Sequence, residues 1–325
     1  MKLPRRKFMV LAAGAAALPA LSRIAWAQAY PSRPLRIMVG FAAGGPTDVL
    51  ARLLGQWLTE RLGQTVLVEN RLGAGTNIAT EAVVKAPPDG YTLLLVTAAN
   101  AINKTLYPNL SFDFLRDIAP VAGVCFEPNA VLLNPSVPAK TLPEFIAYTK
   151  ANPGKITMAS GGNGAPSHVS GEMFKMMAGV SMVHVPYRGA APALTDLLAG
   201  QVDIYFGPLL AGVEHIKTGR LRVLAVTSLK RSEILPDIPT VAEIVPGYEA
   251  IQLYGVGAPK DTPAEIIDKL NKEINAALAD PKIKERFAQL GTTALGGPPE
   301  AFGRYFAEET EKWGKVVKFS GAKAE

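Results

Sequence analysis

Residues 36–48 read RIMVGFAAGGPTD and residues 156–168 read ITMASGGNGAPSH, and these two stretches are the strongest structural signal in the chain. In each, an apolar strand-like run leads into a loop of small residues, which ends at a proline and a hydroxyl residue, as at a helix start. The glycines let the backbone turn tightly and let a ligand approach closely. The following helix offers unpaired N–H groups and about half a positive charge at its N-terminus. Each stretch therefore predicts a binding site for carboxylate or phosphate, named here the first and the second anion loop.

Strand-like and helix-like segments alternate on both sides of the anion loops. Apolar, β-branched runs predict strands at residues 35–39, 66–69, 92–97, 130–134, 156–159, 202–206 and 222–227. Helical patterns lie at residues 47–62, 144–150, 167–178 and 191–199. Two further helices end the chain: the first has Ile266, Leu270, Ile274 and Leu278 on one face, and the second lies at about 299–318. This alternation predicts an α/β fold with parallel sheets.

The composition describes a globular protein of about two domains. The chain has 325 residues, and its single cysteine, Cys125, excludes an intramolecular disulfide and a Cys-based metal site. Residues 1–27 hold five of the positive charges, so the remaining chain has 29 basic and 28 acidic residues. Nucleic-acid-binding proteins usually carry a basic excess in their folded part. The sequence therefore argues against a nucleic-acid partner.

The first 27 residues have the three parts of a secretory signal peptide. A basic stretch at 2–7 precedes an apolar run at 8–20 and the small-x-small site Ala25-Trp26-Ala27. The apolar run is too short to span a bilayer, which takes about 20 residues. Arg5-Arg6 leave two export routes open, a twin-arginine signal or a Sec leader with paired arginines. We expect a soluble, monomeric periplasmic protein, against the alternative of an uncleaved amphipathic anchor.

Two proline clusters, at residues 128–143 and 236–246, surround extended segments that suit crossings between two lobes. A chain that leaves one lobe, builds a second and returns needs two such crossings. We therefore expect a signal peptide at 1–27, one lobe at 28–127 plus 249–325, and a second lobe at 128–248.

Motifs of common enzyme classes are missing: the sequence has no G-x-S-x-G, H-E-x-x-H or G-x-x-x-x-G-K-[ST]. It predicts no metal site and no cofactor. Thr47, Asp48 and Ser167 suit helix N-caps, although Asp48 is also a candidate contact to a bridging water or a ligand hydroxyl. His168, in the second anion loop, is a candidate ligand contact or a brace for the loop, and His184 is expected to be structural.

The order of motifs along the chain resembles the Bug (TctC-like) family of periplasmic solute-binding proteins. The motifs that carry the resemblance are Tyr30-Pro31-x-x-Pro34, Phe41-x-x-Gly44-Gly45-x-x-Asp48-x-x-Ala51-Arg52, Val68-Glu69-Asn70-Arg71-x-Gly73-Ala74-Gly75, Pro87-Pro88-Asp89-Gly90-Tyr91, Ala159-Ser160-Gly161-Gly162-Asn163-Gly164, Val185-Pro186-Tyr187-Arg188-Gly189, Leu198-Ala199-Gly200-Gln201-Val202-Asp203 and Pro236-Asp237-Ile238-Pro239-Thr240. Two positions depart from the family pattern: Thr76 stands where another Gly is common, and Tyr254-Gly255 where Trp-x-Gly is common.

The resemblance implies a two-lobed, type II-like periplasmic-binding-protein fold with a ligand cleft between the lobes. It implies a small ligand, such as a di- or tricarboxylate, an amino acid or an aromatic acid, delivered to a tripartite tricarboxylate transporter. It also implies that main-chain N–H groups of the two loops hold the carboxylate, with bridging waters. The implied ligand contacts are Phe41, Ala43, Gly44 and Asp48 in the first lobe and Ser160, Gly162, Asn163 and Gly164 in the second, with Thr97, Asn100, Tyr187 and Asp203 as looser candidates.

Three functions are compatible with the sequence. The first is a binding protein without catalysis, and the second is a sensor that presents its ligand to a membrane receptor. The third is a secreted hydrolase or isomerase of small acids that uses Asp48, His168 or Asp203 as acid and base. The missing nucleophile–base pair and metal set disfavour the third.

Overall fold

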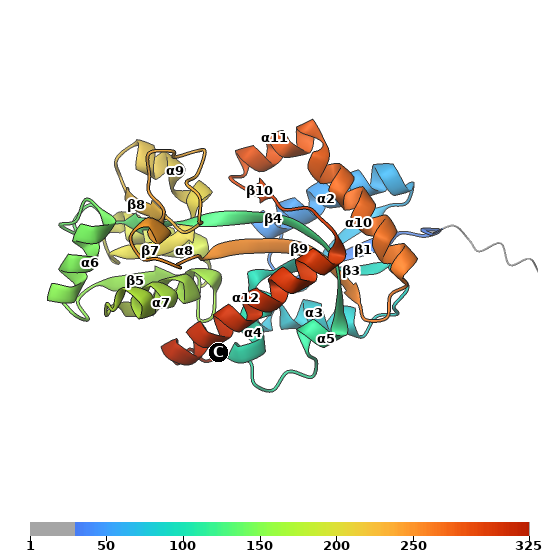
Figure 1. Cartoon of the computed structure of the whole chain (residues 1–325), viewed down its shortest axis with the longest axis horizontal. Helices are drawn as coiled ribbons and strands as arrows, with labels where there is room; N and C mark the ends of the chain where they lie inside the picture. The colour runs from blue at the N-terminus through green and yellow to red at the C-terminus, as the bar shows by residue number, and fades with distance from the viewer. Residues whose placement is uncertain (1–29, 325) are drawn as a thin grey trace, which may run out of the picture.

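The computed structural model describes residues 30–324, so the predicted signal peptide lies outside the described part of the chain. The described elements form two halves along the long axis of the molecule, joined by two long strands, β4 (Ile118–Leu133) and β9 (Ile251–Pro259) (Figure 1). Within residues 30–324, no helix is long and apolar enough to cross a membrane. Nor do these residues contain a group of three or more His, Cys, Asp or Glu placed to hold a metal ion.

The first half is built on a mixed sheet with the strand order β2-β1-β3-β9-β4. Its parallel strands are β1 (Leu35–Val39), β2 (Val66–Asn70) and β3 (Thr92–Thr97), whereas β9 runs antiparallel to β3 and β4. All six residues of β3 are buried, as expected for a strand covered on both faces. The remaining elements of this half are α2 (Pro46–Leu62), α3 (Asn77–Val84), α4 (Ala98–Leu106), α5 (Phe114–Asp117), α10 (Ala264–Ala279), α11 (Pro281–Gln289) and the short strand β10 (Thr293–Ala294).

The second half is likewise a sheet of parallel strands that joins β4, at the carboxyl-terminal end of that strand. Its strands β5 (Thr157–Ser160), β6 (Val183–Pro186) and β7 (Ile204–Pro208) are parallel, and β7 and β8 (Arg222–Val226) both pair antiparallel with β4. Its helices are α6 (Leu142–Ala151), α7 (Pro166–Ala178), α8 (Ala190–Ala199) and α9 (Leu209–Lys217). The predicted α/β class is therefore confirmed, with mixed sheets.

Strand β4 belongs to both halves. Its residues 118–128 pair with β9, and its residues 129–133 pair with β7 and β8. The sequence prediction started this strand at residue 130 and missed the earlier part, because prolines are normally excluded from the middle of a sheet. Here Pro120 lies beside a register shift in the pairing with β9, so an irregular ladder accommodates it.

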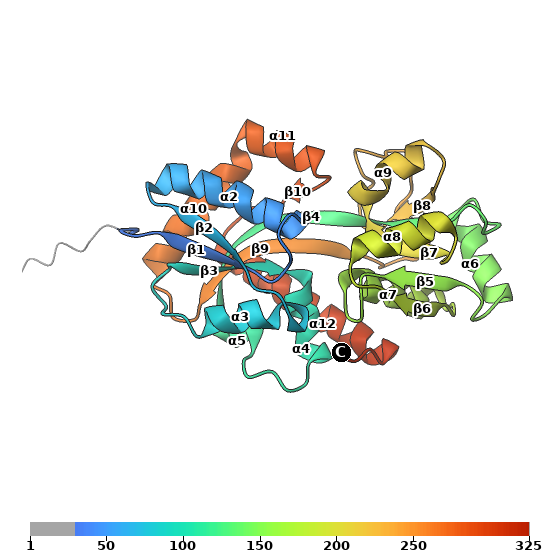
Figure 2. The ribbon, with the colours of Figure 1, turned by 180° about the vertical axis from the view of Figure 1, so that it is seen from behind.

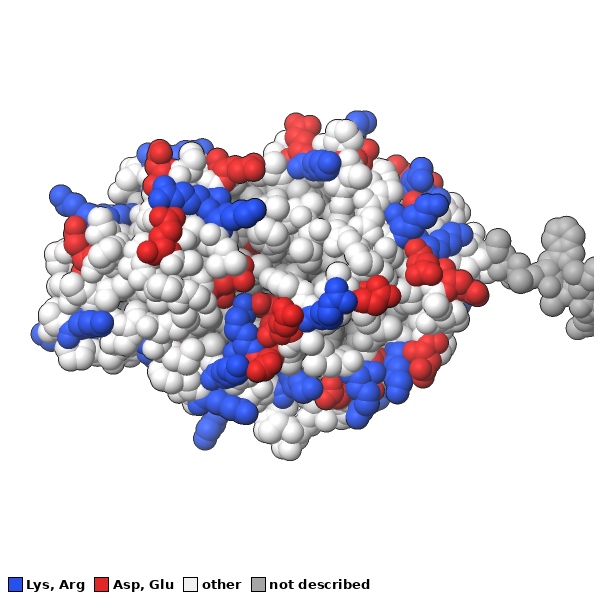
Figure 3. All heavy atoms as spheres, viewed as in Figure 1, with Lys and Arg blue, Asp and Glu red and all other residues white. Residues whose placement is uncertain are grey.

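Helix α12 (Pro299–Ser320) crosses from the first half to the second and packs against both α4 and α7 (Figure 1). Trp313 anchors it, since this side chain is 1% exposed and donates from Nε1 to Glu309 Oε2 at 2.9 Å. Its outer side carries ion pairs such as Lys315–Glu311 at 2.9 Å, and basic and acidic side chains are intermixed on this face of the molecule (Figure 3). The helix is thus a third connection between the halves.

The two anion loops follow the carboxyl ends of parallel strands. The first joins β1 to α2 and the second joins β5 to α7. The N-terminal end of α2 points toward the second half (Figure 2). In α/β folds, ligands bind outside the carboxyl ends of the strands, so the topology predicts a ligand site at the junction between the halves.

Candidate functional site

A backbone hydrogen bond to Asp48 shapes the first anion loop. Gly44 has a φ of +82°, a region that glycine adopts without strain, and its N–H donates to Asp48 Oδ2 at 2.9 Å. The N-cap of α2 is Gly45, which makes no side-chain cap, so Thr47 and Asp48 lie inside the first turn. The prediction that Thr47 or Asp48 is the N-cap is therefore wrong, because the chain enters the helix at Pro46.

Asp48 is 2% exposed and is surrounded by donors. Besides Gly44 N–H, it accepts from Arg52 Nε at 2.8 Å and from Asn70 Nδ2 at 2.9 Å. Asn70 also donates to the carbonyl oxygen of Phe41 at 2.9 Å, so both ends of the loop are held. The hydrogen bonds from Arg52, with smaller contributions from Gly44 and Asn70, lower the pKa of Asp48 to about 2. Asp48 is thus an ionised anchor for the first loop.

The second anion loop is built in the same way. Gly164 has a φ of +71°, and its N–H donates to His168 Nδ1 at 3.0 Å, again four residues along the chain. A Cβ at Gly164 would lie 2.0 Å from a methyl carbon of Leu106 in α4, so a larger residue here would also displace Leu106 from this contact between the halves. The N-cap of α7 is Ala165, and the hydroxyl of Ser167 accepts from Gly161 N–H at 2.9 Å. The prediction that Ser167 is the N-cap is therefore wrong.

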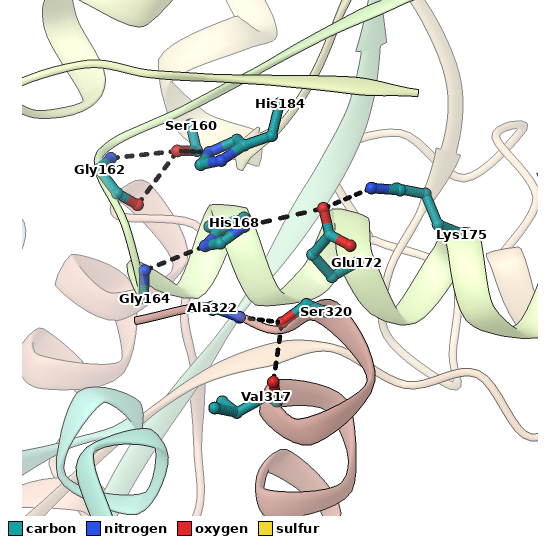
Figure 4. Close-up of polar contacts among 10 residues, drawn as sticks. All are labelled: Ser160, Gly162, Gly164, His168, Glu172, Lys175, His184, Val317, Ser320 and Ala322. Carbon is teal, nitrogen blue, oxygen red and sulfur yellow. Dashed lines mark hydrogen bonds and ion pairs between the residues drawn. The ribbon is translucent and has the colours of Figure 1, made fainter. Parts of the chain in front are cut away.

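Two stacked histidines lie behind the second loop (Figure 4). The rings of His168 and His184 are 3.7 Å apart and 6° from parallel, and His184 Nε2 lies 2.6 Å from Ser160 Oγ. Since His168 Nδ1 accepts from Gly164, the neutral ring carries its proton on Nε2, which lies 3.7 Å from Glu172 Oε1. Burial, with additional effects of neighbouring charges, lowers the pKa of His168 to about 3 and that of His184 to about 4. The predicted brace role of His168 matches these contacts.

A carboxyl group and two tyrosines connect the loops underneath. Glu127 in β4 is 3% exposed, and Tyr254 in β9 donates to its Oε2 at 3.5 Å. The Tyr254 hydroxyl also interacts with the Thr47 side chain, in the first turn of α2. In the other half, the Tyr205 hydroxyl interacts with Ser167, in the first turn of α7. Sequence reasoning did not single out Glu127 or Tyr205, although a lone acid within the apolar run 121–133 was a usable signal.

The remaining predicted residues fall into two groups. Phe41, Ala43, Ser160, Gly162 and Asn163 lie in the anion loops themselves; Ala43 and Asn163 are exposed, whereas Ser160 is buried and accepts from Gly162 N–H at 3.1 Å. Tyr187 lies beside the second loop, because its N–H donates to the Ser160 carbonyl, but its hydroxyl donates to Asp196 in α8.

Thr97, Asn100 and Asp203 have structural partners. Asn100 Oδ1 accepts from Thr97 N–H at 2.9 Å, and both residues are 4% exposed at the start of α4. Asp203 accepts from the backbone and the hydroxyl of Thr157, both at 2.7 Å, at the amino end of β5. The second anion loop leaves the carboxyl end of that strand, so the structure does not bring Asp203 to the loops.

A family model described as the tripartite tricarboxylate transporter family receptor matches residues 50–321. The chain belongs to this family. Protein BugT of Bordetella pertussis is 39% identical over 300 residues, covering 91% of this chain and 92% of BugT. The resemblance predicted from the motifs is thereby confirmed.

Solved structures of similar proteins share the fold. Rpa4515 of R. palustris, solved with adipate, is 36% identical with a TM-score of 0.81 over 90% of this chain and 99% of that one. The periplasmic binding protein BugD is 39% identical with a TM-score of 0.78 over 91% of this chain and 100% of that one. The predicted periplasmic-binding-protein fold is confirmed by these similarities.

The histidine pair predicts a pH dependence of stability. The folded-state pKa of His168 lies below the unfolded value of about 6.5. The folded protein therefore keeps its full stability above that pH. As the pH falls toward 3, the unfolded chain binds a proton that the folded protein does not, and the free energy of unfolding falls. One such group adds up to about 1.4 kcal/mol of destabilisation per pH unit. In His168→Asn, whose amide oxygen replaces the acceptor, the free energy of unfolding should fall less steeply from pH 6 to pH 5, by about 1 kcal/mol. Urea unfolding measures this, and equal slopes would contradict the assignment.

Proposed function

We propose that this receptor-family protein captures a small carboxylate between its two anion loops, in the periplasm, for delivery to a membrane transporter. The observation that carries the proposal is the repeated construction of the loops, each with a positive-φ glycine whose N–H is held by the side chain four residues later. Adipate, bound in the related Rpa4515, is a ligand of this class. A helix N-terminus attracts a negative charge, and two facing ones hold the same small anion from both sides.

The hydrogen bonds within the loops refine the set of donors. The N–H groups of Gly44, Gly162 and Gly164 donate to side chains of their own loops, so these glycines shape the site instead of binding directly. Among residues 30–324, the N–H groups of Phe41 and Ala43 donate no hydrogen bond within the protein. These two groups, together with the first-turn N–H groups of the helices, are the donors that we assign to the ligand.

The proposal involves no catalysis. Asp48 and His168, the predicted acid–base candidates, both accept hydrogen bonds from their own loops. Asp203, the third candidate, is hydrogen-bonded to Thr157 at the opposite end of β5. These contacts use Asp48 and His168 to hold the backbone of their own loops and keep Asp203 away from the loops, which supports binding without catalysis.

Carboxylate binding can be tested by thermal unfolding with adipate and with malate. At 100 times its dissociation constant, a ligand of the folded state adds about 2.7 kcal/mol, which for this chain length raises Tm by roughly 5–10 °C. Gly44→Val should lose most of this shift, because a branched side chain at positive φ distorts the first loop and crowds the ligand. Gly162→Val should do the same from the second loop.

Gly63→Val is the matched control for Gly44→Val. Gly63 has a φ of +70° just beyond α2, and neither glycine has another atom within 4 Å of an added Cβ. Both valines should therefore cost similar stability, on the order of 1–2 kcal/mol, while only the one at Gly44 abolishes the ligand-induced shift. An undiminished shift in both Gly44→Val and Gly162→Val would contradict the two-loop site.

We also propose that the halves are the lobes predicted from the sequence, residues 28–127 plus 249–325 and residues 128–248, and that they close on the ligand. The strands β4 and β9 connect them, and in hinge closure a few residues of such connections absorb the change in backbone angles. Small-angle scattering should show a smaller radius of gyration with saturating adipate than without it. An unchanged profile, with binding confirmed by calorimetry, would exclude closure.

The periplasmic assignment requires removal of residues 1–27. Its support is the basic, apolar and small-x-small order of this segment, together with the periplasmic relative BugD. N-terminal sequencing of the protein from a periplasmic extract should begin at Gln28 or within a few residues of it. Soluble periplasmic protein that still carries Met1 would contradict the cleavage.

A further inference from the structure

Glu127 is a buried carboxyl group at the point where the two halves meet. It lies one residue before the end of the pairing between β4 and β9, and the pairing between β4 and β7 begins two residues later, at Asn129. Its side chain interacts with Tyr254 of the first half and lies near Tyr205 of the second. Glu127 is therefore flanked by one element from each half.

No basic side chain compensates this acid. Within residues 30–324, Glu127 takes part in no ion pair, and the titratable groups facing it are Cys125 on β4, Tyr254 on β9 and Tyr205 on β7. Burial and the neighbouring acid raise the pKa of each of these three groups, so all are neutral at pH 7. By contrast Glu309, which is equally buried at 4% exposed, pairs with Lys312. An uncompensated buried carboxylate is costly, so Glu127 has to acquire either a proton or a cationic partner.

The tyrosines place Glu127 next to both anion loops. Tyr254 interacts with Thr47, in the first turn of α2, and Tyr205 interacts with Ser167, in the first turn of α7. Each tyrosine thus links the surroundings of the Glu127 carboxyl to one helix N-terminus. An anion held by these two N-termini would therefore lie close to Glu127. In a poorly hydrated region, two negative charges at such a distance repel strongly.

We propose that Glu127 couples ligand capture to proton uptake, so that a carboxylate without an amino group binds together with one proton on Glu127. This inference rests on the proposed function, since it needs an anion between the loops. Burial already raises the pKa of Glu127 to about 7, so the empty protein is partly ionised at neutral pH. A bound anion raises it further, and the complex holds Glu127 neutral. Amino acids differ, because their ammonium group can pair with ionised Glu127 and makes the proton unnecessary.

The sign of the pH effect follows directly. Below pH 7 the empty protein already carries the proton, so affinity for adipate is constant. Above pH 7 each ligand must bring a proton with it, so affinity should fall on the order of tenfold from pH 6 to pH 8. The other charged anchors do not titrate in this window, since the pKa of Asp48 is about 2 and those of the two stacked histidines are about 3 and 4.

The test is titration calorimetry of the whole protein with adipate, and separately with malate, in buffers of different ionisation enthalpy. Wild-type protein at pH 8 should take up close to one proton per bound adipate. Glu127→Gln, a neutral group of the same shape that Tyr254 can still donate to, should take up none and should bind adipate about tenfold more tightly than wild type at pH 8. Glu309→Gln, which removes an equally buried acid whose partners are Lys312 and Trp313 and no loop residue, should behave like wild type.

The outcomes separate the two proposals. If neither adipate nor malate binds wild-type protein, the carboxylate function fails and this inference fails with it. If they bind without proton uptake and with the same affinity at pH 6 and pH 8, only the role of Glu127 is overturned. That role is also overturned if Glu127→Gln keeps the wild-type proton uptake. The wild-type measurement decides the question even if the variant does not fold.

Discussion

One hydrogen bond, made twice, shapes the region where the halves meet: a glycine N–H just before a helix donates to the side chain of the residue four positions later. Asp48 accepts it in the first half and His168 in the second. The bond holds the preceding residues in a tight turn, which leaves the helix N-terminus unobstructed. Ordering the backbone of a loop costs about 1–2 kcal/mol of conformational entropy per residue, and this hydrogen bond offsets part of that cost.

The two acceptors differ in chemistry because their surroundings differ. Asp48 is ionised, since Arg52 and Asn70 donate to it together with Gly44. His168 is neutral, since burial and a stacked second ring disfavour a positive charge. In each loop, nevertheless, one lone pair of the acceptor faces the N–H group of the glycine, Gly44 or Gly164. The duplication is therefore one of geometry, and it explains why residues typical of acid–base catalysis serve here as parts of the scaffold.

The long strands impose a second constraint, because a sheet shared by two halves brings their cores together at a narrow junction. Tyr254 and Tyr205 contribute hydroxyl groups there from both sides, and both tyrosines are neutral. Glu127 is the exception in this neutral environment. Helix α12 packs across the same junction on another side, so motion between the halves has to be accommodated along that helix as well as in β4 and β9.

The sequence alone determined the two strand–loop–helix units, the α/β class and the family, because glycine, proline and apolar periodicity act on neighbouring residues. It also located the loops that contain Phe41, Gly44 and Gly164. Tertiary structure decided the partners: Asn70 reaches Asp48 from the next strand, and His184 reaches His168 from β6. It also showed Asp203 at the opposite end of its strand from the loops, and Glu127 between two tyrosines. Strand order brings distant side chains together, and local patterns in the sequence do not specify that order.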